Sequence, residues 1–193
     1  EDNKVDQIMK VAAPVGVVAG IIPTTNPTST TIFKAMICMK TRNPIIFSFH
    51  PSAEKCSAAT AKVVYDAAIK AGAPADCIQW VEGVSMEKTA ELINHPEVAV
   101  VLATGGAAMV KAAYSTGKPA LGVGPGNVPA YIEKTANIKR AVNDIIVSKT
   151  FDNGMICASE QAAIVDSEIY DEVKKEFQLH NVYFAKPEEI QQL

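Results

Sequence analysis

The segment VGVVAGIIPTTNPTSTTIFK, residues Val15–Lys34, decides the fold. Its apolar first half ends at Pro23, and Thr24-Thr25-Asn26 then lie between two prolines, which restrict the backbone on both sides. The pattern predicts a strand over Val15–Ile22, a short loop and a helix over Pro27–Lys40. A strand that is apolar at nearly every position is typical of a parallel sheet with both faces covered.

The same alternation of apolar runs and Ala/Lys-rich helical stretches continues along the chain, which predicts βαβ units. We predict strands over Val15–Ile22, Pro44–Phe49, Cys77–Val81, Val98–Ala103, Ala120–Val123 and Ala162–Val165. We predict helices over Pro27–Lys40, Ser52–Ala71, Ser85–Ile93, Ala107–Tyr114, Ile138–Thr150, Ser167–Gln178 and Pro187–Gln192. Ser52 is expected to cap the second of these helices and Gly72 to close it. The fold class is therefore α/β, with a doubly wound, mostly parallel sheet.

Composition excludes several classes of protein. The chain has 193 residues, of which 48% are hydrophobic and 20% are charged, and its formal net charge is -3. This length and balance fit one globular domain or slightly more, and they do not fit a disordered chain. A slightly acidic balance with Arg42 and Arg140 as the only arginines argues against a nucleic-acid partner.

Neither a membrane segment nor a metal site is predicted. The longest apolar run, Val11–Pro23, is interrupted by proline and glycine and is shorter than the ~18 residues of a membrane-spanning helix. No signal-peptide pattern opens the chain. A chain of this size does not need disulfides, so we expect its four cysteines to be in a reducing, cytoplasmic setting. The four cysteines fit no CxxC spacing, so no metal ligands are assigned.

Two loops follow predicted strands and carry polar or glycine residues. Asn26 lies after the first strand, where it is either a plain helix cap or a donor to a ligand. Gly105-Gly106 follow a later strand and open a helix, which is either a tight left-handed turn or a site for an anion at a helix N-terminus. The spacing of these glycines does not meet the GxGxxG dinucleotide fingerprint.

Cys157 differs from the other cysteines in its surroundings. Cys38, Cys56 and Cys77 lie in helix or strand patterns beside apolar neighbours, and we expect them to be small buried hydrophobes. Cys157 follows the glycine-containing loop that begins at Phe151, so its thiol is a candidate nucleophile. No histidine is near it in sequence, and a papain-type Cys/His pair is not predicted.

These motifs occur in one order: an asparagine loop, a Thr-Gly-Gly turn, a glycine-rich connection and F-x-x-G-x-x-C. Together they resemble the aldehyde dehydrogenase superfamily. The segments IIPTTNPTSTTIFK, SFHPSA, ATGGAAMVKAAYSTGKPALGVGPGN and SKTFDNGMICASEQ are similar to its CoA-acylating branch, and most similar to the aldehyde dehydrogenase half of bifunctional acetaldehyde-CoA/alcohol dehydrogenases. The resemblance covers nearly the whole chain.

The resemblance implies a role for each matching residue. Cys157 stands at the position of the catalytic nucleophile, and Asn26 at that of the side-chain amide of the oxyanion hole. Ser48 stands where many hydrolytic members have a lysine for the adenine ribose, with His50 two residues on, which leaves the preference for NAD over NADP open. The implied contacts to the cofactor NAD come from Pro23, Thr24, Thr25, Ser48, His50, Thr104, Gly105, Gly106 and Gly124.

The resemblance also implies the reaction. Hydrolytic members place a glutamate in an E-L-G-G-K segment to activate water, whereas the matching stretch here, Leu121–Pro129, has no Asp or Glu. A CoA thiolate needs less help than water. The implied activity is therefore acetaldehyde + CoA + NAD+ to acetyl-CoA + NADH, reversible, through a thioester on Cys157. Aldehyde and CoA are the small-molecule partners.

Two alternatives stay open. One is a hydrolytic aldehyde dehydrogenase whose base comes from elsewhere, with Glu133 and Glu160 as candidates. The other is a non-catalytic nucleotide-binding or assembly module in which Cys157 is inert.

The glycine- and proline-rich stretch Lys118–Ala130 is expected to be an irregular connection and a domain boundary. By the resemblance, residues 1–130 are a dinucleotide-binding domain, incomplete at its N-terminus, and residues 131–193 begin a truncated α/β catalytic domain. The family's subunit is longer than this chain, so activity of the piece alone is not implied. Apolar surface left exposed would favour a homo-oligomer, and some bifunctional relatives form filaments and carry a fused alcohol dehydrogenase domain.

Overall fold

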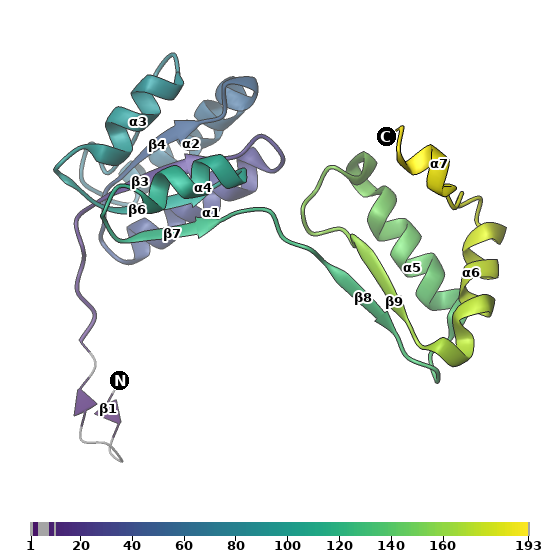
Figure 1. Ribbon diagram of the computed structural model, residues 1–193. Helices are drawn as coiled ribbons and strands as arrows, with labels where there is room; N and C mark the ends of the chain where they lie inside the picture. The colour runs from purple at the N-terminus through teal and green to yellow at the C-terminus, as the bar shows by residue number, and fades with distance from the viewer. Residues whose placement is uncertain (1, 4–7, 10, 193) are drawn as a thin grey trace. The chain divides into compact units, whose positions relative to one another are not determined.

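The computed structural model describes residues 2–3, 8–9 and 11–192 (Figure 1). The chain forms two compact units, Glu1–Pro125 and Gly126–Leu193. The sequence places a boundary after residue 130, whereas the units divide before Pro129 because Pro129–Ile132 forms a strand, β8, that pairs within the second unit. Proline is tolerated at the first residue of a strand, so the proline-rich connection does not extend as far as we expected.

The first unit is built on a five-stranded parallel sheet. Two short strands, β1 (Asp2–Asn3) and β2 (Ile8–Met9), pair with each other antiparallel. The sheet strands are β3 (Val17–Ile22), β4 (Ile45–Phe49), β5 (Ile78–Trp80), β6 (Val98–Thr104) and β7 (Ala120–Val123). They lie in the order β5-β4-β3-β6-β7, and all neighbouring pairs are parallel. The predicted doubly wound α/β fold is confirmed.

Helices cover both faces of this sheet (Figure 1). They are α1 (Pro27–Lys40), the short 3-10 helix η1 (Pro51–Ala53), α2 (Glu54–Lys70), α3 (Met86–Asn94) and α4 (Ala107–Tyr114). Val18 and Ile22 of β3 pack with buried residues of α1 and α2, whereas Ala19 and Ile21 pack with buried residues of α3 and α4. Alternate residues of one strand therefore serve two cores, which is why the strand is apolar throughout.

Two local expectations were wrong. The first strand begins at Val17 and not at Val15, because the backbone N–H groups of Val15 and Gly16 donate to the Asn43 side chain at 2.7 and 3.1 Å. Ser52 does not cap α2: it lies inside η1, where its N–H donates to His50 Nδ1. The expected closing residue, Gly72, does have a left-handed backbone, with φ of 91°.

The second unit is smaller. It contains β8, α5 (Ile138–Thr150), the 3-10 helix η2 (Phe151–Gly154), β9 (Ala162–Val165), η3 (Ser167–Ile169), α6 (Tyr170–Leu179) and α7 (Pro187–Ile190). β8 and β9 pair in parallel, and Ile132, Val142 and Val173 form the buried core between these strands, α5 and α6. No helix among the described residues is long and apolar enough to cross a membrane.

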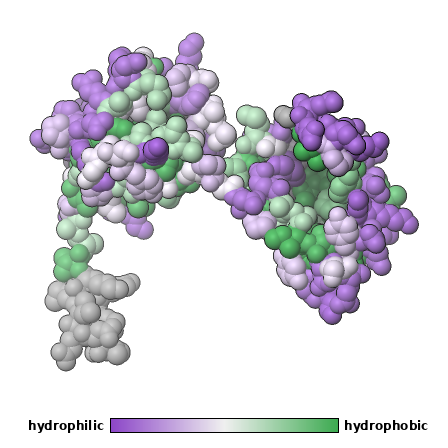
Figure 2. Space-filling model, in the orientation of Figure 1, coloured by the Kyte–Doolittle hydropathy of each residue, from purple (hydrophilic) through white to green (hydrophobic). Residues whose placement is uncertain are grey.

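Apolar residues also reach the surface of both units (Figure 2). In the first unit Phe33 and Met36 of α1 and Leu121 of β7 are more than 60% exposed. In the second unit Tyr131 of β8 and Ile164 of β9, which are paired across the two strands, are also exposed.

Candidate active site

The topology of the first unit creates a ligand crevice. The chain enters the sheet at its central strand, β3, adds β4 and β5 on one side, and then adds β6 and β7 on the other. The loops after β3 and β6 therefore diverge from the same point at the carboxyl edge, which is where doubly wound sheets bind ligands. These are the two loops that hold Asn26 and Thr104–Gly106.

A cavity of about 260 Å³ lies at this crevice. The ends of β3, β4 and β6 contribute to its lining, together with Ser85 and Met86 at the start of α3. The structure brings together six of the residues that the sequence assigns to a nucleotide, Pro23, Ser48, His50, Thr104, Gly105 and Gly106.

The N-terminus of α4 has the features of an anion site. Gly106 is its N-cap residue, with φ of -67°, and no side chain caps the helix. Because neither Gly105 nor Gly106 has positive φ, the alternative of a left-handed turn is wrong. The first turn has no acidic residue, and a Cβ at Gly106 would meet no atom within 4 Å. Exposed backbone N–H groups, open space and the helix dipole fit the pyrophosphate of a dinucleotide.

The two residues proposed near the adenine ribose differ in accessibility. Ser48 is 1% exposed, and its hydroxyl lies 2.7 Å from the Thr89 hydroxyl, with which it shares a hydrogen bond. His50 is exposed, and its Nδ1 accepts from the Ser52 N–H at 3.2 Å, so the ring presents Nε2. Gly124 lies beyond the end of β7 and does not line this cavity.

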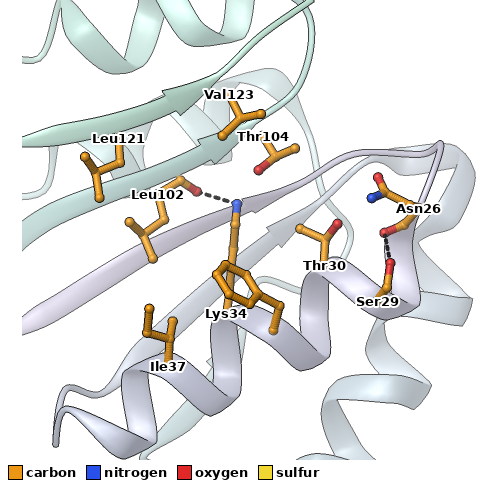
Figure 3. A pocket seen from close by; sticks show the side chains of 10 residues that line it. Asn26, Ser29, Thr30, Lys34, Ile37, Leu102, Thr104, Leu121 and Val123 are labelled. Atoms are coloured by element: carbon orange, nitrogen blue, oxygen red, sulfur yellow. Dashed lines mark hydrogen bonds between the residues drawn. The ribbon is translucent and has the colours of Figure 1, made fainter. Parts of the chain in front are cut away.

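Asn26 lines a second cavity, of about 470 Å³, between α1 and strands β6 and β7 (Figure 3). It occupies the N-cap position of α1, but its side chain makes no capping hydrogen bond. Its Oδ1 accepts from the Thr25 hydroxyl at 3.2 Å, while its Nδ2 donates to none of residues 11–192. The plain capping role is therefore not used, and the amide remains available to a ligand.

Lys34 is a buried lysine that lines this second cavity, and the sequence analysis did not select it. It is 4% exposed, and its Nζ donates to the carbonyls of Ile21 and Leu102 at 2.7 and 2.8 Å. Burial lowers the pKa of Lys34 to about 7, and it also raises the pKa of the neighbouring Cys38 thiol to about 11. The signal was its spacing: Lys34 is four residues after Thr30 and four before Cys38, both on the buried face of α1.

Cys157 lies in a turn of the second unit. Asp152, Asn153 and Gly154 have φ of 51°, 52° and 73°, so the backbone is left-handed over three successive residues before the turn. Both the N–H and the hydroxyl of buried Ser159 donate to the Ile156 carbonyl, at 3.2 and 3.0 Å. Cys157 therefore lies within a turn closed by Ser159, and its thiol is exposed.

The other cysteines divide into two groups. Cys38 and Cys77 are buried, as expected, but Cys56 is exposed. The expectation for Cys56 was wrong because the next residue, Ser57, and Ala61 form the buried face of α2.

The two candidate bases for hydrolysis differ in their hydrogen bonding: Glu133 has hydrogen-bond donors, whereas Oε2 of Glu160 is buried without a partner among the described residues. Glu133 accepts from the N–H and hydroxyl of Thr135 at 2.8 and 2.5 Å, and the Thr135 hydroxyl holds the pKa of that carboxyl below its usual range. The Ser148 hydroxyl beside Glu160 likewise lowers the pKa of that carboxyl. A carboxylate with a lowered pKa is a weaker base, so neither group is tuned to activate water.

A family model named "Aldehyde dehydrogenase family" matches residues 2–182. The chain belongs to the aldehyde dehydrogenase family. Over 182 residues it is 66% identical to Aldehyde-alcohol dehydrogenase 2 of Entamoeba histolytica, a match that covers 94% of this chain and 21% of that protein. The chain thus spans about a fifth of the length of that aldehyde-alcohol dehydrogenase.

Solved structures of aldehyde dehydrogenases share the fold. An acetylating aldehyde dehydrogenase from Geobacillus thermoglucosidasius is 57% identical, with a TM-score of 0.85 over 93% of this chain and 40% of that one. A propionaldehyde dehydrogenase from Rhodopseudomonas palustris, solved with bound CoA and an acylated cysteine, is 36% identical, with a TM-score of 0.83 over 93% of this chain and 41% of that one.

Proposed function

We propose that this chain supplies the nucleotide-binding loops and the nucleophile of an NAD-dependent, CoA-acylating aldehyde dehydrogenase. The observation that carries the proposal is the exposed Cys157 thiol, presented in a turn that Ser159 closes. A nucleophile must be accessible to its substrate, and a buried thiol would be inert. The similarity to an acetylating aldehyde dehydrogenase supports the same activity.

The Cys157 thiolate adds to the carbonyl carbon of the aldehyde, and the carbonyl electron pair moves to oxygen. The resemblance to aldehyde dehydrogenases assigns the role of oxyanion donors to the side-chain amide of Asn26 and the backbone N–H of Cys157. Each such donor contributes roughly 2.7–4 kcal/mol to stabilising the transition state. NAD+, when bound, supplies the acceptor for the hydride that leaves the carbon. A thioester remains on Cys157, and the thiolate of CoA takes the acyl group and releases the enzyme cysteine.

The preference for CoA over water rests on the lack of a tuned base. The stretch Leu121–Pro129 has no carboxylate, and the neighbouring hydroxyls of Thr135 and Ser148 lower the pKa of the Glu133 and Glu160 carboxyls. Water needs a base to become nucleophilic at neutral pH, whereas a thiol with a pKa near 8.5 is partly ionised.

The nucleotide is held by the first unit in this proposal. The uncapped N-terminus of α4 takes the pyrophosphate, and the cavity between Pro23, His50 and Thr104 takes an adjoining part of the cofactor. The proposed nucleotide loops are completed by Thr24, Thr25, Gly105 and Gly124. Ser48, whose hydroxyl is bonded to Thr89, lines the cavity from β4. The second unit, Gly126–Leu193, then begins the catalytic domain.

The matched relative is an aldehyde-alcohol dehydrogenase by name, which supports a fused alcohol dehydrogenase as a partner domain. Exposed apolar side chains on both units support assembly into a homo-oligomer, with filaments as its extended form. Four unpaired cysteines support a reducing, cytoplasmic setting.

The test is the CoA requirement of the complete enzyme. With acetaldehyde and NAD+, we expect NADH to form steadily only when CoA is added, and the product to be acetyl-CoA. Acetate formed at a comparable rate without CoA would overturn the acylating assignment in favour of hydrolysis. An absence of NADH under both conditions, with intact NAD+ binding, would favour a non-catalytic nucleotide module.

A further inference from the structure

Lys34 is an unusual residue for the interior of a sheet protein. Its side chain rises from α1 toward the strands and ends at the Leu102 carbonyl (Figure 3). Lysine is almost never fully buried without a partner, because its charged form loses hydration. An apolar side chain of similar length would fill the same space without this penalty. A lysine retained there indicates that its hydrogen bonds serve a purpose other than packing.

The two carbonyl partners lie on adjacent strands. Ile21 is the penultimate residue of β3, and Leu102 precedes Thr104, the last residue of β6. The strands pair in parallel near these residues, with Ile21 opposite Ala103. One nitrogen therefore joins α1, β3 and β6 at the carboxyl edge of the sheet, at distances of 2.7 and 2.8 Å.

These strand ends lead directly into the two ligand loops. The loop after β3 runs from Pro23 to Asn26, and the turn after β6 is Thr104–Gly106. The connections after β3 and β6 lead to opposite sides of the sheet. The backbone hydrogen bonds between β3 and β6 therefore stop holding the two segments together once each strand ends. A third attachment from α1 limits how far the loops can separate.

We propose that Lys34 is a positioning residue that fixes the spacing of the Asn26 loop and the Thr104–Gly106 turn by joining the ends of β3 and β6. The proposal rests on the proposed function in one respect: the ligand that both loops serve is a dinucleotide. Two N–H groups satisfy both carbonyls, so the neutral amine can perform this role as well as the ammonium. The lowered pKa of Lys34, caused by burial, is in keeping with that arrangement, and among residues 11–192 Cys38 is the titratable neighbour that affects it.

The test compares Lys34→Met with Lys40→Met in the complete chain. Lys40 is an exposed lysine at the end of the same helix, so its replacement is a matched control. Amide hydrogen exchange is followed at residues 24–26 and 104–106 and, as an internal reference, in α2. We expect Lys34→Met to raise exchange in the two loops while α2 is unchanged. NADH binding should weaken roughly tenfold, the scale of losing one or two buried hydrogen bonds.

Lys34→Arg is the rescue variant, because a guanidinium also donates to two carbonyls and the adjoining cavity of about 470 Å³ has room for it. We expect it to restore both loop protection and NADH binding. Unchanged loop exchange in Lys34→Met, or exchange raised equally in the loops and α2, would overturn the positioning role. If the unmodified chain binds no NADH, the proposed nucleotide function fails, and loop exchange alone decides the role of Lys34.

Discussion

The β6–α4 turn and the Cys157 turn present their functional groups by different means. Thr104–Gly106 lies at the carboxyl end of β6 in the five-stranded sheet, and the N-cap residue Gly106 has an ordinary negative φ. Cys157 sits beyond a helix end, after three successive residues with left-handed backbone. The position of the first turn follows from the order of the strands in the sheet, and the apolar runs spread along the chain determine those strands. The position of the second depends on the conformations of a few consecutive residues.

Replacing the nucleophile has the largest expected effect. In the complete enzyme, Cys157→Ser should lower CoA-dependent NADH formation by about 10³-fold or more, because a serine hydroxyl is far less ionised at neutral pH. Cys56→Ser is the matched control, since Cys56 is the other exposed cysteine. Equal losses in the two variants would remove the distinction between the Cys157 turn and an ordinary surface thiol.

Asn26→Ala should have the next largest effect. We expect kcat to fall by about 10²–10³-fold, the range for removing one oxyanion-hole donor. Thermal stability should stay nearly constant, because the Asn26 side chain makes no capping bond. A large drop in melting temperature with a small drop in kcat would assign Asn26 to the structure of the β3–α1 loop instead.

The buried Lys34 predicts a pH dependence of stability in the first unit. Its pKa falls from an ordinary 10.5 to about 7 on folding, so the unfolded chain binds more protons between these values. Stability therefore rises as pH increases from 7 to 9, by up to about 1.4 kcal/mol per pH unit. The opposite contribution of Cys38, whose pKa rises from 9.0 to about 11, sets in near pH 9 and dominates only above it.

Urea unfolding at pH 7 and pH 9 measures this slope. Lys34→Met should remove it, and Lys40→Met should keep it. The same slope in the wild-type chain and in Lys34→Met would show that Lys34 is not the group responsible.

Two glycine substitutions compare the Cys157 turn with the β6–α4 turn, and we expect them to have the smallest effects. Gly154→Ala places a Cβ on a residue with φ of 73° and 3.3 Å from the Lys149 carbonyl oxygen, so it should destabilise the second unit by about 1–2 kcal/mol. Gly106→Ala should change stability by less than about 0.5 kcal/mol, because its Cβ meets open space, yet weaken NADH binding. Equal effects on stability, measured by thermal unfolding, would contradict the comparison.

The apolar runs around Val18, Phe47 and Val101 determined the sheet, because residues buried on both faces leave a clear pattern. They also located the loops of Asn26 and Gly106, since loops at carboxyl ends follow from the topology. The pattern could not reveal that Asn26 leaves its cap unused or that the Ser48 hydroxyl is taken by Thr89.

The sequence analysis missed two other features because the type of a single residue suggested a different structure. Strand β8 was not predicted because it begins at a proline, Pro129, and depends on pairing with β9, which is more than thirty residues away. A lysine is expected at the surface, so Lys34 was passed over although its helical spacing placed it on a buried face. Tertiary contacts decided both cases.

The most direct measurement of the central claim is the site of acylation. The complete enzyme is incubated with acetyl-CoA, quenched in acid to preserve thioesters, digested and mapped by mass spectrometry. We expect an acetyl thioester on Cys157 and none on Cys56, Cys38 or Cys77. Acetyl groups distributed equally over Cys157 and Cys56, or present only on Cys56, would contradict the assignment of Cys157 as the nucleophile.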